Sequence, residues 1–156
     1  MSFSIISDSG ANLTQQLVAE YGIKIVSLTY SVGDTEYLSY IDGQEVDYKS
    51  FYDKLRAGEH IKTSLVGYDR VEEALKAELD KGNDVLYISF SSALSGSHQI
   101  AKNCINDLSE QYPDRKMIIV DSLCASMGQG LLIKYAVEMK NRGCSLEETA
   151  EWLENN

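Results

Sequence analysis

The chain has 156 residues, 44% of them hydrophobic, which corresponds to about one domain with a substantial buried core. It carries 24 acidic and 14 basic residues, so its formal net charge is −10. This charge argues against binding to nucleic acids and to anionic membrane surfaces, because both favour basic proteins. The sequence has no apolar run of about 18 residues, so we expect no membrane-spanning helix.

Cysteine and histidine usage predicts a cytoplasmic protein without a metal site. The three cysteines, Cys104, Cys124 and Cys144, are widely spaced and form no Cys-x-x-Cys motif. This pattern favours free thiols over a disulfide framework or a zinc site. The two histidines, His60 and His98, do not form a His-x-x-x-His pair, so we expect no metal ion and no cofactor held by one.

Short apolar runs typical of strands alternate along the chain with segments of helical periodicity. The expected strands lie at 3–7, 23–30, 85–88 and 116–121. The expected helices lie at 13–21, 51–55, 71–79, 96–112, 127–141 and 146–153, while 36–46 is interpreted as short strands or an irregular loop. The alternation predicts an α/β fold with a mostly parallel sheet and helices on both of its faces.

Two helix starts carry a capping-box pattern, a hydroxyl or amide residue followed three positions later by Glu or Gln. Asn12 with Gln15 predicts that the first helix begins at Asn12. Ser145 with Glu148 predicts the start of the last helix in the same way.

A loop of small hydroxyl residues, Ser89–Ser97, joins the expected strand at 85–88 to the following helix. We expect Ser95 to be the N-cap of that helix, with the amides of Gly96 and Ser97 free beside it. The positive end of the helix dipole and these amides favour a carboxylate or a phosphate. The alternative interpretation is that the serines only cap the helix and fill the turn.

Three loops with small polar residues follow strands, around Ser9, Ser95 and Ser122, and Thr63-Ser64 is a further hydroxyl-bearing segment. In parallel sheets, ligands bind in the crevice beyond the carboxyl ends of the strands. We therefore expect these loops to converge on one ligand site.

The residues available for catalysis are few. The sequence has no Gly-x-Ser-x-Gly elbow and no phosphate-binding P-loop motif. His98 is expected on the first helical turn after Ser95. Asp8 and Asp121 close two strands and are candidate acids or metal ligands, but an aspartate in this position more often caps the turn that follows it. These residues favour binding of an anionic head group over bond cleavage.

Several motifs occur in an order that resembles the DegV family of bacterial proteins. They are Ser7-Asp8-Ser9, Lys62-Thr63-Ser64, Ser91-Ser92-Ala93-Leu94-Ser95-Gly96-Ser97, Val120-Asp121-Ser122 and Ala125-Ser126-Met127-Gly128-Gln129-Gly130. The resemblance spans essentially the whole chain. It implies a protein that binds a long-chain fatty acid and presents its carboxylate to a partner fatty acid kinase for phospholipid synthesis.

The same resemblance implies which residues hold the ligand. Thr63 and Ser95 would bind the carboxylate. Further residues would lie near the head group or the start of the acyl chain: Ser64, Gly96, Ser97, Ser126 and Met127. The bound fatty acid would be the only ligand. An enzyme remains the alternative, a phosphotransferase or hydrolase acting on a small anionic substrate, because the family's fold is similar to that of some sugar and dihydroxyacetone phosphotransferase components.

The chain departs from the family pattern in places. The segment 63–67 lacks the usual Gln-Pro-Ser after its Thr-Ser, Ser97 replaces a usual threonine, and Gly10 stands where threonine is usual. Family members are also about twice as long. We therefore expect 1–122 to form the α/β ligand-binding domain and 123–156 to lead into a second domain that closes over the ligand.

Overall fold

The computed structural model describes residues 3–44 and 47–156, which form a four-stranded parallel sheet and a three-stranded antiparallel sheet with their helices. The strands are β1 (Phe3–Asp8), β2 (Lys24–Val26), β3 (Thr29–Val32), β4 (Thr35–Leu38), β5 (Ile61–Thr63), β6 (Asp84–Ser89) and β7 (Met117–Asp121). The helices are the 3-10 turn η1 (Ser9–Ala11), α1 (Gln15–Tyr21), α2 (Tyr48–Arg56), α3 (Tyr68–Leu79), α4 (Ser97–Gln111), α5 (Met127–Asn141) and α6 (Leu146–Glu154).

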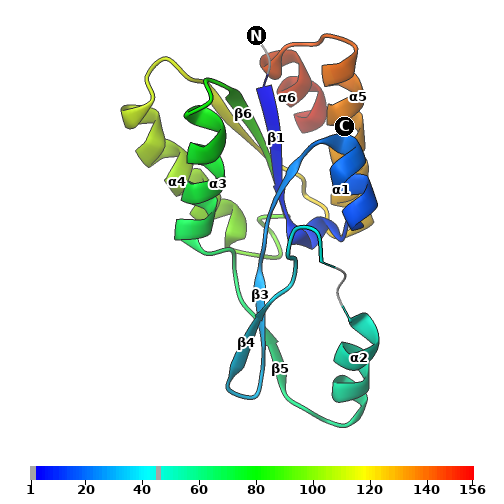
Figure 1. Ribbon diagram of the computed structural model, residues 1–156. Helices are drawn as coiled ribbons and strands as arrows, with labels where there is room; N and C mark the ends of the chain where they lie inside the picture. The colour runs from blue at the N-terminus through cyan, green and yellow to red at the C-terminus, as the bar shows by residue number, and fades with distance from the viewer. Residues whose placement is uncertain (1–2, 45–46) are drawn as a thin grey trace.

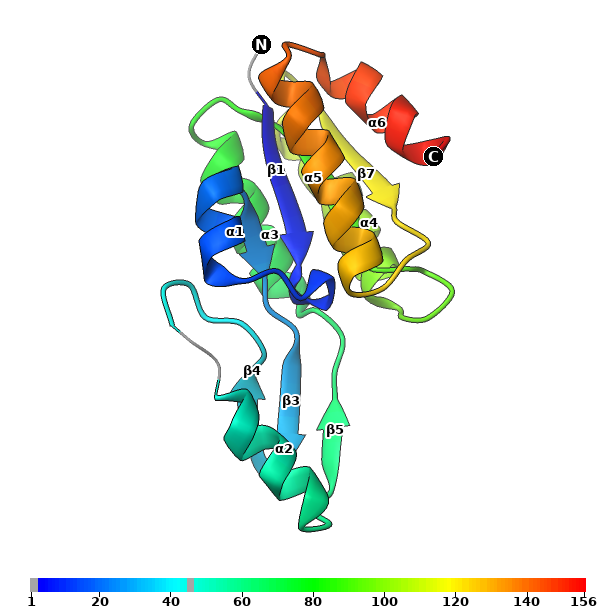
Figure 2. The same ribbon diagram turned by 90° about the vertical axis from the view of Figure 1, so that its right-hand side faces the viewer.

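The parallel sheet has the strand order β2-β1-β6-β7 and confirms the predicted α/β fold. Helices α3 and α4 cover one face, and α1, α5 and α6 cover the other (Figures 1 and 2). The register pairs Ser7 with Ile88 and Ser89 with Asp121. The carboxyl ends of β1, β6 and β7 therefore lie at one edge, where the loops that follow them meet.

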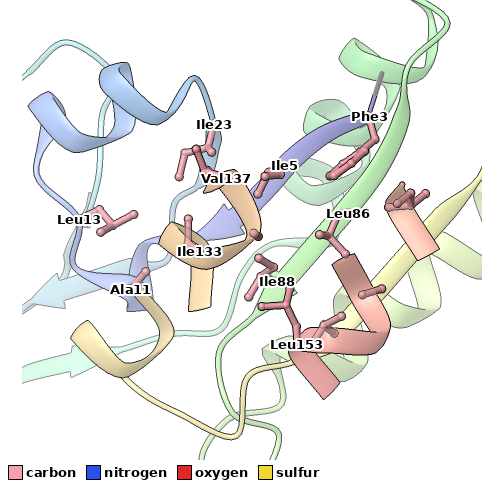
Figure 3. Close-up of a cluster of buried hydrophobic side chains, with 14 of the residues drawn as sticks. Phe3, Ile5, Ala11, Leu13, Ile23, Leu86, Ile88, Ile133, Val137 and Leu153 are labelled. Carbon is pink, nitrogen blue, oxygen red and sulfur yellow. The ribbon is translucent and has the colours of Figure 1, made fainter. Parts of the chain in front are cut away.

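Alternation along the two central strands divides the core into two clusters. Ile5 of β1 and Leu86 of β6 point toward α5 and α6, where they pack with Ile133 and Leu153 (Figure 3). The side chains of Ile6 in β1 and of Val85 and Tyr87 in β6 point to the opposite face of the sheet, into the cluster under α3 and α4. Every residue of β6 is buried because both faces are covered, which explains its uninterrupted apolar run.

The expected single strand at 23–30 is wrong. The segment contributes β2 to the parallel sheet and β3 to the antiparallel sheet. The two strands are separated by Ser27 and Leu28, and the Ser27 hydroxyl accepts a hydrogen bond from Tyr40 N at 2.9 Å and donates one to Leu28 O at 2.7 Å. The buried hydroxyl thus stabilises a break between two strands inside a sequence that reads as one β-forming run.

The expected start of the first helix is also wrong. Asn12 has a left-handed backbone (φ 51°), and Thr14 is the N-cap, accepting a hydrogen bond from Leu17 N at 3.2 Å. The capping box at Ser145 and Glu148 is confirmed at the start of α6, with both reciprocal hydrogen bonds present. The Thr14 hydroxyl, two residues after Asn12, therefore caps the first helix in its place.

Strands β3, β4 and β5 with helix α2 form a lobe that extends beyond the carboxyl edge of the parallel sheet (Figure 2). The Tyr30 ring joins them, stacking on Tyr37 at 5.3 Å and meeting the edge of Phe51 at 5.2 Å. Of the segment expected as short strands or loop, β4 forms its beginning, residues 39–44 are irregular, and 45–46 lie outside the described residues. In the part of the chain that the structure describes, no helix is long and apolar enough to cross a membrane.

Candidate functional site

The loops after β1, β6 and β7 meet at the carboxyl edge of the parallel sheet, as expected. Gly10 O accepts a hydrogen bond from Ser126 N at 2.9 Å, which joins the first loop to the third. Ser91 N donates to Cys124 O at 3.1 Å, and Ser92 N donates to the Asp121 carboxylate at 3.0 Å. Backbone hydrogen bonds thus hold three loops, far apart in sequence, in a fixed relative position.

Asp8, the last residue of β1, holds this junction of loops together. Its carboxylate accepts hydrogen bonds from Gly10 N at 3.0 Å, Phe90 N at 2.8 Å and the Gln129 amide at 3.3 Å. Burial raises the pKa of the Asp8 carboxyl, although each of these hydrogen bonds acts to lower it. The Gln129 amide also donates to Ser7 Oγ at 3.0 Å, so α5 is fastened to the end of β1. The predicted turn-capping role of Asp8 is confirmed.

Asp121 performs the same structural role one loop away. It accepts hydrogen bonds from Leu123 N at 3.1 Å and from Ser92 N. Partial burial acts to raise its pKa, but these hydrogen bonds outweigh the burial and lower the pKa overall. Both aspartates therefore shape loops, as expected from their positions at strand ends.

The helix after the serine loop begins one residue later than expected. Helix α4 begins at Ser97 with Gly96 as its N-cap, so the expectation of Ser95 at that position is wrong. The Ser95 hydroxyl still accepts a hydrogen bond from Ser97 N at 3.2 Å and donates to Ser97 Oγ at 2.9 Å. Ser97 Oγ in turn accepts from Val66 N at 3.2 Å, which ties this helix start to the segment that follows Thr63.

Ser126 and Met127 lie at the start of α5. Ser126 has φ 53° and ψ −130°, a region that non-glycine residues rarely occupy and that costs about 1–3 kcal/mol. Its hydroxyl accepts a hydrogen bond from the Asn12 amide at 3.0 Å, in addition to the backbone bond to Gly10. Two contacts to the first loop therefore compensate the strained backbone and fix where α5 begins.

An open cavity of about 210 Å³ lies between this edge and the lobe of β3, β4, β5 and α2. Its polar lining comes from the parallel sheet edge and the lobe, and its apolar lining is largely aromatic. The lining residues are Asp8, Ser9, Asn12, Leu13, Ile25, Tyr30, Ser39, Tyr40, Tyr48, Phe51, Tyr52 and Thr63. Burial and the nearby Asp42 raise the pKa of Tyr40 to about 12, so its hydroxyl stays neutral and donates to Gln15 Oε1 at 3.0 Å.

The structure places the predicted site residues in three groups. Thr63, the last residue of β5, lines the cavity and is exposed. Ser64 continues from it, and a Cβ at Gly96 would lie 3.2 Å from Leu65 in the same segment, which places the α4 start beside it. Ser95 and Ser97 belong to that helix start, whereas Ser126 and Met127 are joined to the first loop. Figures 1 and 2 show all of these loops at one end of the sheet.

Sequence reasoning missed most of the cavity wall. Tyr30, Tyr40, Phe51 and Tyr52 come from separate segments and carry no motif. The available signal was composition, because the chain has ten tyrosines and several of them cluster between positions 30 and 52. Periodicity places a residue on a face of its own element but gives no information on which distant element it will meet.

The enzyme alternative depended on a base next to the exposed serines. His98 is on the first turn of α4, as expected, and its Nδ1 lies 2.7 Å from Ser89 Oγ. Ser89 is fully buried and also donates to Val120 O at 3.2 Å, so this contact belongs to the sheet. Among residues 3–44 and 47–156, no cluster of three or more His, Cys, Asp or Glu side chains could hold a metal ion.

These features define a class of protein. A parallel α/β sheet whose carboxyl edge carries a cavity with hydroxyl groups and aromatic walls is suited to binding a small molecule with a polar head and an apolar body. The comparisons with known proteins agree with this class. Residues 2–156 match the family described as "Uncharacterised protein, DegV family", and the chain belongs to the DegV family.

Relatives and solved structures extend this assignment. A DegV domain-containing protein of Clostridium perfringens is 40% identical over 99% of this chain, which covers 53% of the relative. A stearic-acid-binding protein of Eubacterium ventriosum has a TM-score of 0.87 at 26% identity, over 97% of this chain and 52% of that one. A fatty-acid-binding DegV protein of Thermus thermophilus has a TM-score of 0.84 at 27% identity, over 99% and 53%. The chain therefore spans about half the length of these proteins.

Proposed function

We propose that this chain is the part of a long-chain fatty-acid-binding protein that holds the carboxylate and part of the acyl chain. The observation that carries the proposal is the cavity, which combines the Thr63 hydroxyl with walls of Tyr30, Phe51 and Tyr52 at the carboxyl edge of the sheet. The related proteins of Eubacterium ventriosum and Thermus thermophilus are described as binding stearic acid and fatty acid. A fatty acid matches the cavity, because its carboxylate suits the hydroxyl groups and its acyl chain suits the aromatic walls.

In this proposal Thr63 donates a hydrogen bond to the carboxylate, and Ser95 donates a second one by turning its hydroxyl hydrogen away from Ser97 Oγ. Hydrogen bonds to a charged group are worth about 1.5–3 kcal/mol each, so two hydroxyls supply a strong and directional hold. Secondary contacts come from Ser64, Gly96, Ser97, Ser126 and Met127. The hydrogen bond from Val66 N to Ser97 Oγ supports the assignment, because it holds the start of α4 beside the segment that follows Thr63.

The acyl chain supplies most of the binding energy. Burial of each CH₂ group contributes about 0.8 kcal/mol, so a 16-carbon tail contributes on the order of 10 kcal/mol before ordering costs. Thr63 is exposed and Ser95 is half-buried in this chain. We propose that the α/β ligand-binding unit, which includes α5 and α6 within 123–156 because they pack on its sheet, leads into a second domain that covers the head group and completes the acyl site.

We further propose that the protein is a carrier without catalytic activity. It would present the carboxylate in the cytoplasm to a partner fatty acid kinase that supplies phospholipid synthesis. The contact of His98 with buried Ser89 supports a carrier, because this candidate base is engaged with the sheet. The three free cysteines support a reducing compartment.

Lipid extraction and mass spectrometry of the purified protein test the proposal. The wild type is expected to carry a long-chain fatty acid, and the Thr63→Val/Ser95→Ala double variant is expected to lose it. A matched control, Thr35→Val/Ser109→Ala, removes the same two hydroxyl types from an exposed strand and from the last turn of α4, and it should retain the lipid.

A form extended to the length of the relatives is analysed in parallel. Fatty acid in the extended form alone would indicate that the second domain is required for retention. Absence of fatty acid from both forms would refute the carrier proposal. Retention by the Thr63→Val/Ser95→Ala variant would refute the assignment of the carboxylate to these hydroxyls.

A further inference from the structure

A second cavity, of about 190 Å³, lies at the edge strand β2 of the parallel sheet. Its walls come from α1, β2 and α3 and are mostly apolar. The residues that line it and not the first cavity are Val18, Ile23, Lys24, Asp42, Ala74 and Ala77. The two charged residues among them are exposed, so the second cavity offers an apolar space with a charged rim.

Two residues, Ile25 and Tyr40, line both cavities and therefore separate them. Ile25 belongs to β2 and pairs with Ser7 of β1, so the parallel sheet fixes its position. Tyr40 lies in the irregular segment after β4, and its half-buried ring packs against the core cluster under α5 and α6. The size of the side chain at position 40 thus determines whether the two cavities are joined.

Tyr40 is held at both of its ends. Its N–H donates to Ser27 Oγ at 2.9 Å, and its hydroxyl donates to Gln15 Oε1 at 3.0 Å. The same Gln15 oxygen accepts a hydrogen bond from Gly43 N at 3.0 Å, and its Nε2 donates to Ile41 O at 2.8 Å. These contacts fix the ring in one position relative to α1.

Tyr40 lies across β3 from the proposed carboxylate site. The strand order β4-β3-β5 places Thr63, the last residue of β5, and Tyr40, two residues after β4, on opposite sides of β3. Tyr30 of β3 pairs with Thr63. The preceding residue, Thr29, pairs with Leu38. Neighbouring strands lie about 4.8 Å apart, so about 10 Å separates the ends of β5 and β4, and an acyl chain that starts at Thr63 and crosses β3 reaches Tyr40.

We propose that the Tyr40 ring ends the acyl site on the side of β2 and thereby sets the longest acyl chain that this part of the protein accepts. The inference rests on the fatty-acid-binding function proposed above and deepens it, because it adds a limit on the length of the ligand. With the ring in place, the acyl chain is confined to the first cavity. With the ring removed, the terminal carbons of a longer chain enter the apolar second cavity.

The Tyr40→Ala variant tests the role of the ring. Protein freed of lipid is offered an equimolar series of saturated fatty acids of increasing length, and the bound acids are quantified by mass spectrometry. The acid two carbons longer than the wild-type optimum should gain on that optimum by up to about fourteenfold, or about fourfold for each additional buried CH₂ group. Tyr40→Phe keeps the ring and loses the hydrogen bond to Gln15, so its optimum should stay at the wild-type length.

A double variant tests whether the second cavity is the space that opens. Ala77 lines this cavity from an exposed position on α3, so α3 tolerates a larger side chain there and the side chain fills the cavity. Tyr40→Ala/Ala77→Leu should reverse most of the shift, as expected for coupled sites. Tyr40→Ala/Ala19→Leu is the matched control and should keep the shift, because Ala19 is exposed on α1 and lines neither cavity.

The outcomes separate this inference from the function on which it rests. Wild type without fatty acid, in this chain and in the extended form, overturns both, and the variants are made in the form that retains fatty acid. An unchanged optimum in Tyr40→Ala, or loss of all fatty acid from the folded variant, overturns the length limit alone. An equal shift in Tyr40→Phe overturns it as well, because the ring is still present.

Two further results complete the test. A shift that persists in Tyr40→Ala/Ala77→Leu overturns the second cavity as the space for the longer chain. If Tyr40→Ala does not unfold cooperatively in urea, Tyr40→Leu takes its place, because it shortens the side chain and keeps it apolar. The same shift toward longer acids is then expected, and an unchanged optimum again overturns the length limit.

Discussion

Replacement of Glu78 by Gln should make the stability of the protein respond differently to acid. Glu78 is only 5% exposed, near the end of α3, and its carboxylate accepts hydrogen bonds from Ser4 Oγ at 2.5 Å, Asn83 Nδ2 at 2.9 Å and Lys81 Nζ at 2.7 Å. Burial acts to raise the pKa of Glu78, but these three donors outweigh it and lower the pKa to about 2. The ionised side chain thus fastens the end of α3 to the beginning of β1.

The magnitude follows from the two pKa values. A difference between the ordinary 4.5 and about 2 corresponds to about 3 kcal/mol of folding free energy. Because the folded-state pKa is lowered, this stabilisation is fully present above pH 4.5 and is lost as the pH falls through about 2. The Lys81 side chain is 60% exposed, so solvent screening makes about 3 kcal/mol an upper value.

Urea unfolding of wild type and Glu78→Gln at pH 7, pH 4.5 and pH 3 measures the effect. The variant should be less stable by about 2–3 kcal/mol at pH 7, and the difference should shrink toward pH 3, because the Glu78 carboxylate of the unfolded wild type takes up a proton below pH 4.5 while that of the folded state stays ionised. Glu73→Gln, an exposed position on the same helix, is the control. A stability difference that stays constant across these pH values would show that the ionised carboxylate of Glu78 contributes nothing specific.

Three further predictions concern the N-cap of α6, the contact between Gln129 and Asp8, and the reactivity of the cysteines. Ser145→Ala should cost about 1 kcal/mol in urea unfolding, because it leaves the reciprocal cap with Glu148 incomplete; an unchanged midpoint would contradict this. Gln129→Leu should cost about 1–3 kcal/mol, since the buried Asp8 carboxylate loses a donor, and a neutral result would mean that the amide is dispensable. Burial raises the pKa of the Cys104 thiol to about 11, so a thiol reagent should modify two cysteines in the native protein and Cys104 only on unfolding.

The sequence was sufficient to predict the parallel sheet and its helices because each of these elements shows a local signal. The run at 85–88 lies inside β6, which is buried on both faces, and Pro113, which cannot continue a helix, follows the end of α4. Gly22 ends α1 with a left-handed backbone (φ 61°), which glycine adopts readily at the end of a helix. Such signals act over a few residues and survive in the folded state because tertiary packing agrees with them.

The lobe and the cavity could not be predicted in the same way. Ile23 to Tyr30 shows β-propensity throughout, and propensity does not specify with which partner a strand pairs. The break between β2 and β3 at Ser27 involves a hydrogen bond from Tyr40, thirteen positions later in the chain. Contacts of this kind, like the approach of Phe90 to Gly10, are set by three-dimensional packing and leave no periodic trace.

The lobe of β3, β4, β5 and α2 has a consequence for how the molecule fluctuates. Within the described residues between 29 and 63, Val32 is the only buried hydrophobic residue, and α2 buries none. The two core clusters lie almost entirely outside this segment. Hydrogen exchange should therefore be fast for the lobe amides and slow for β1 and β6, because the lobe opens without unfolding the sheet. A ligand that occupies the cavity would slow exchange in the lobe, so local amide protection reports occupancy directly.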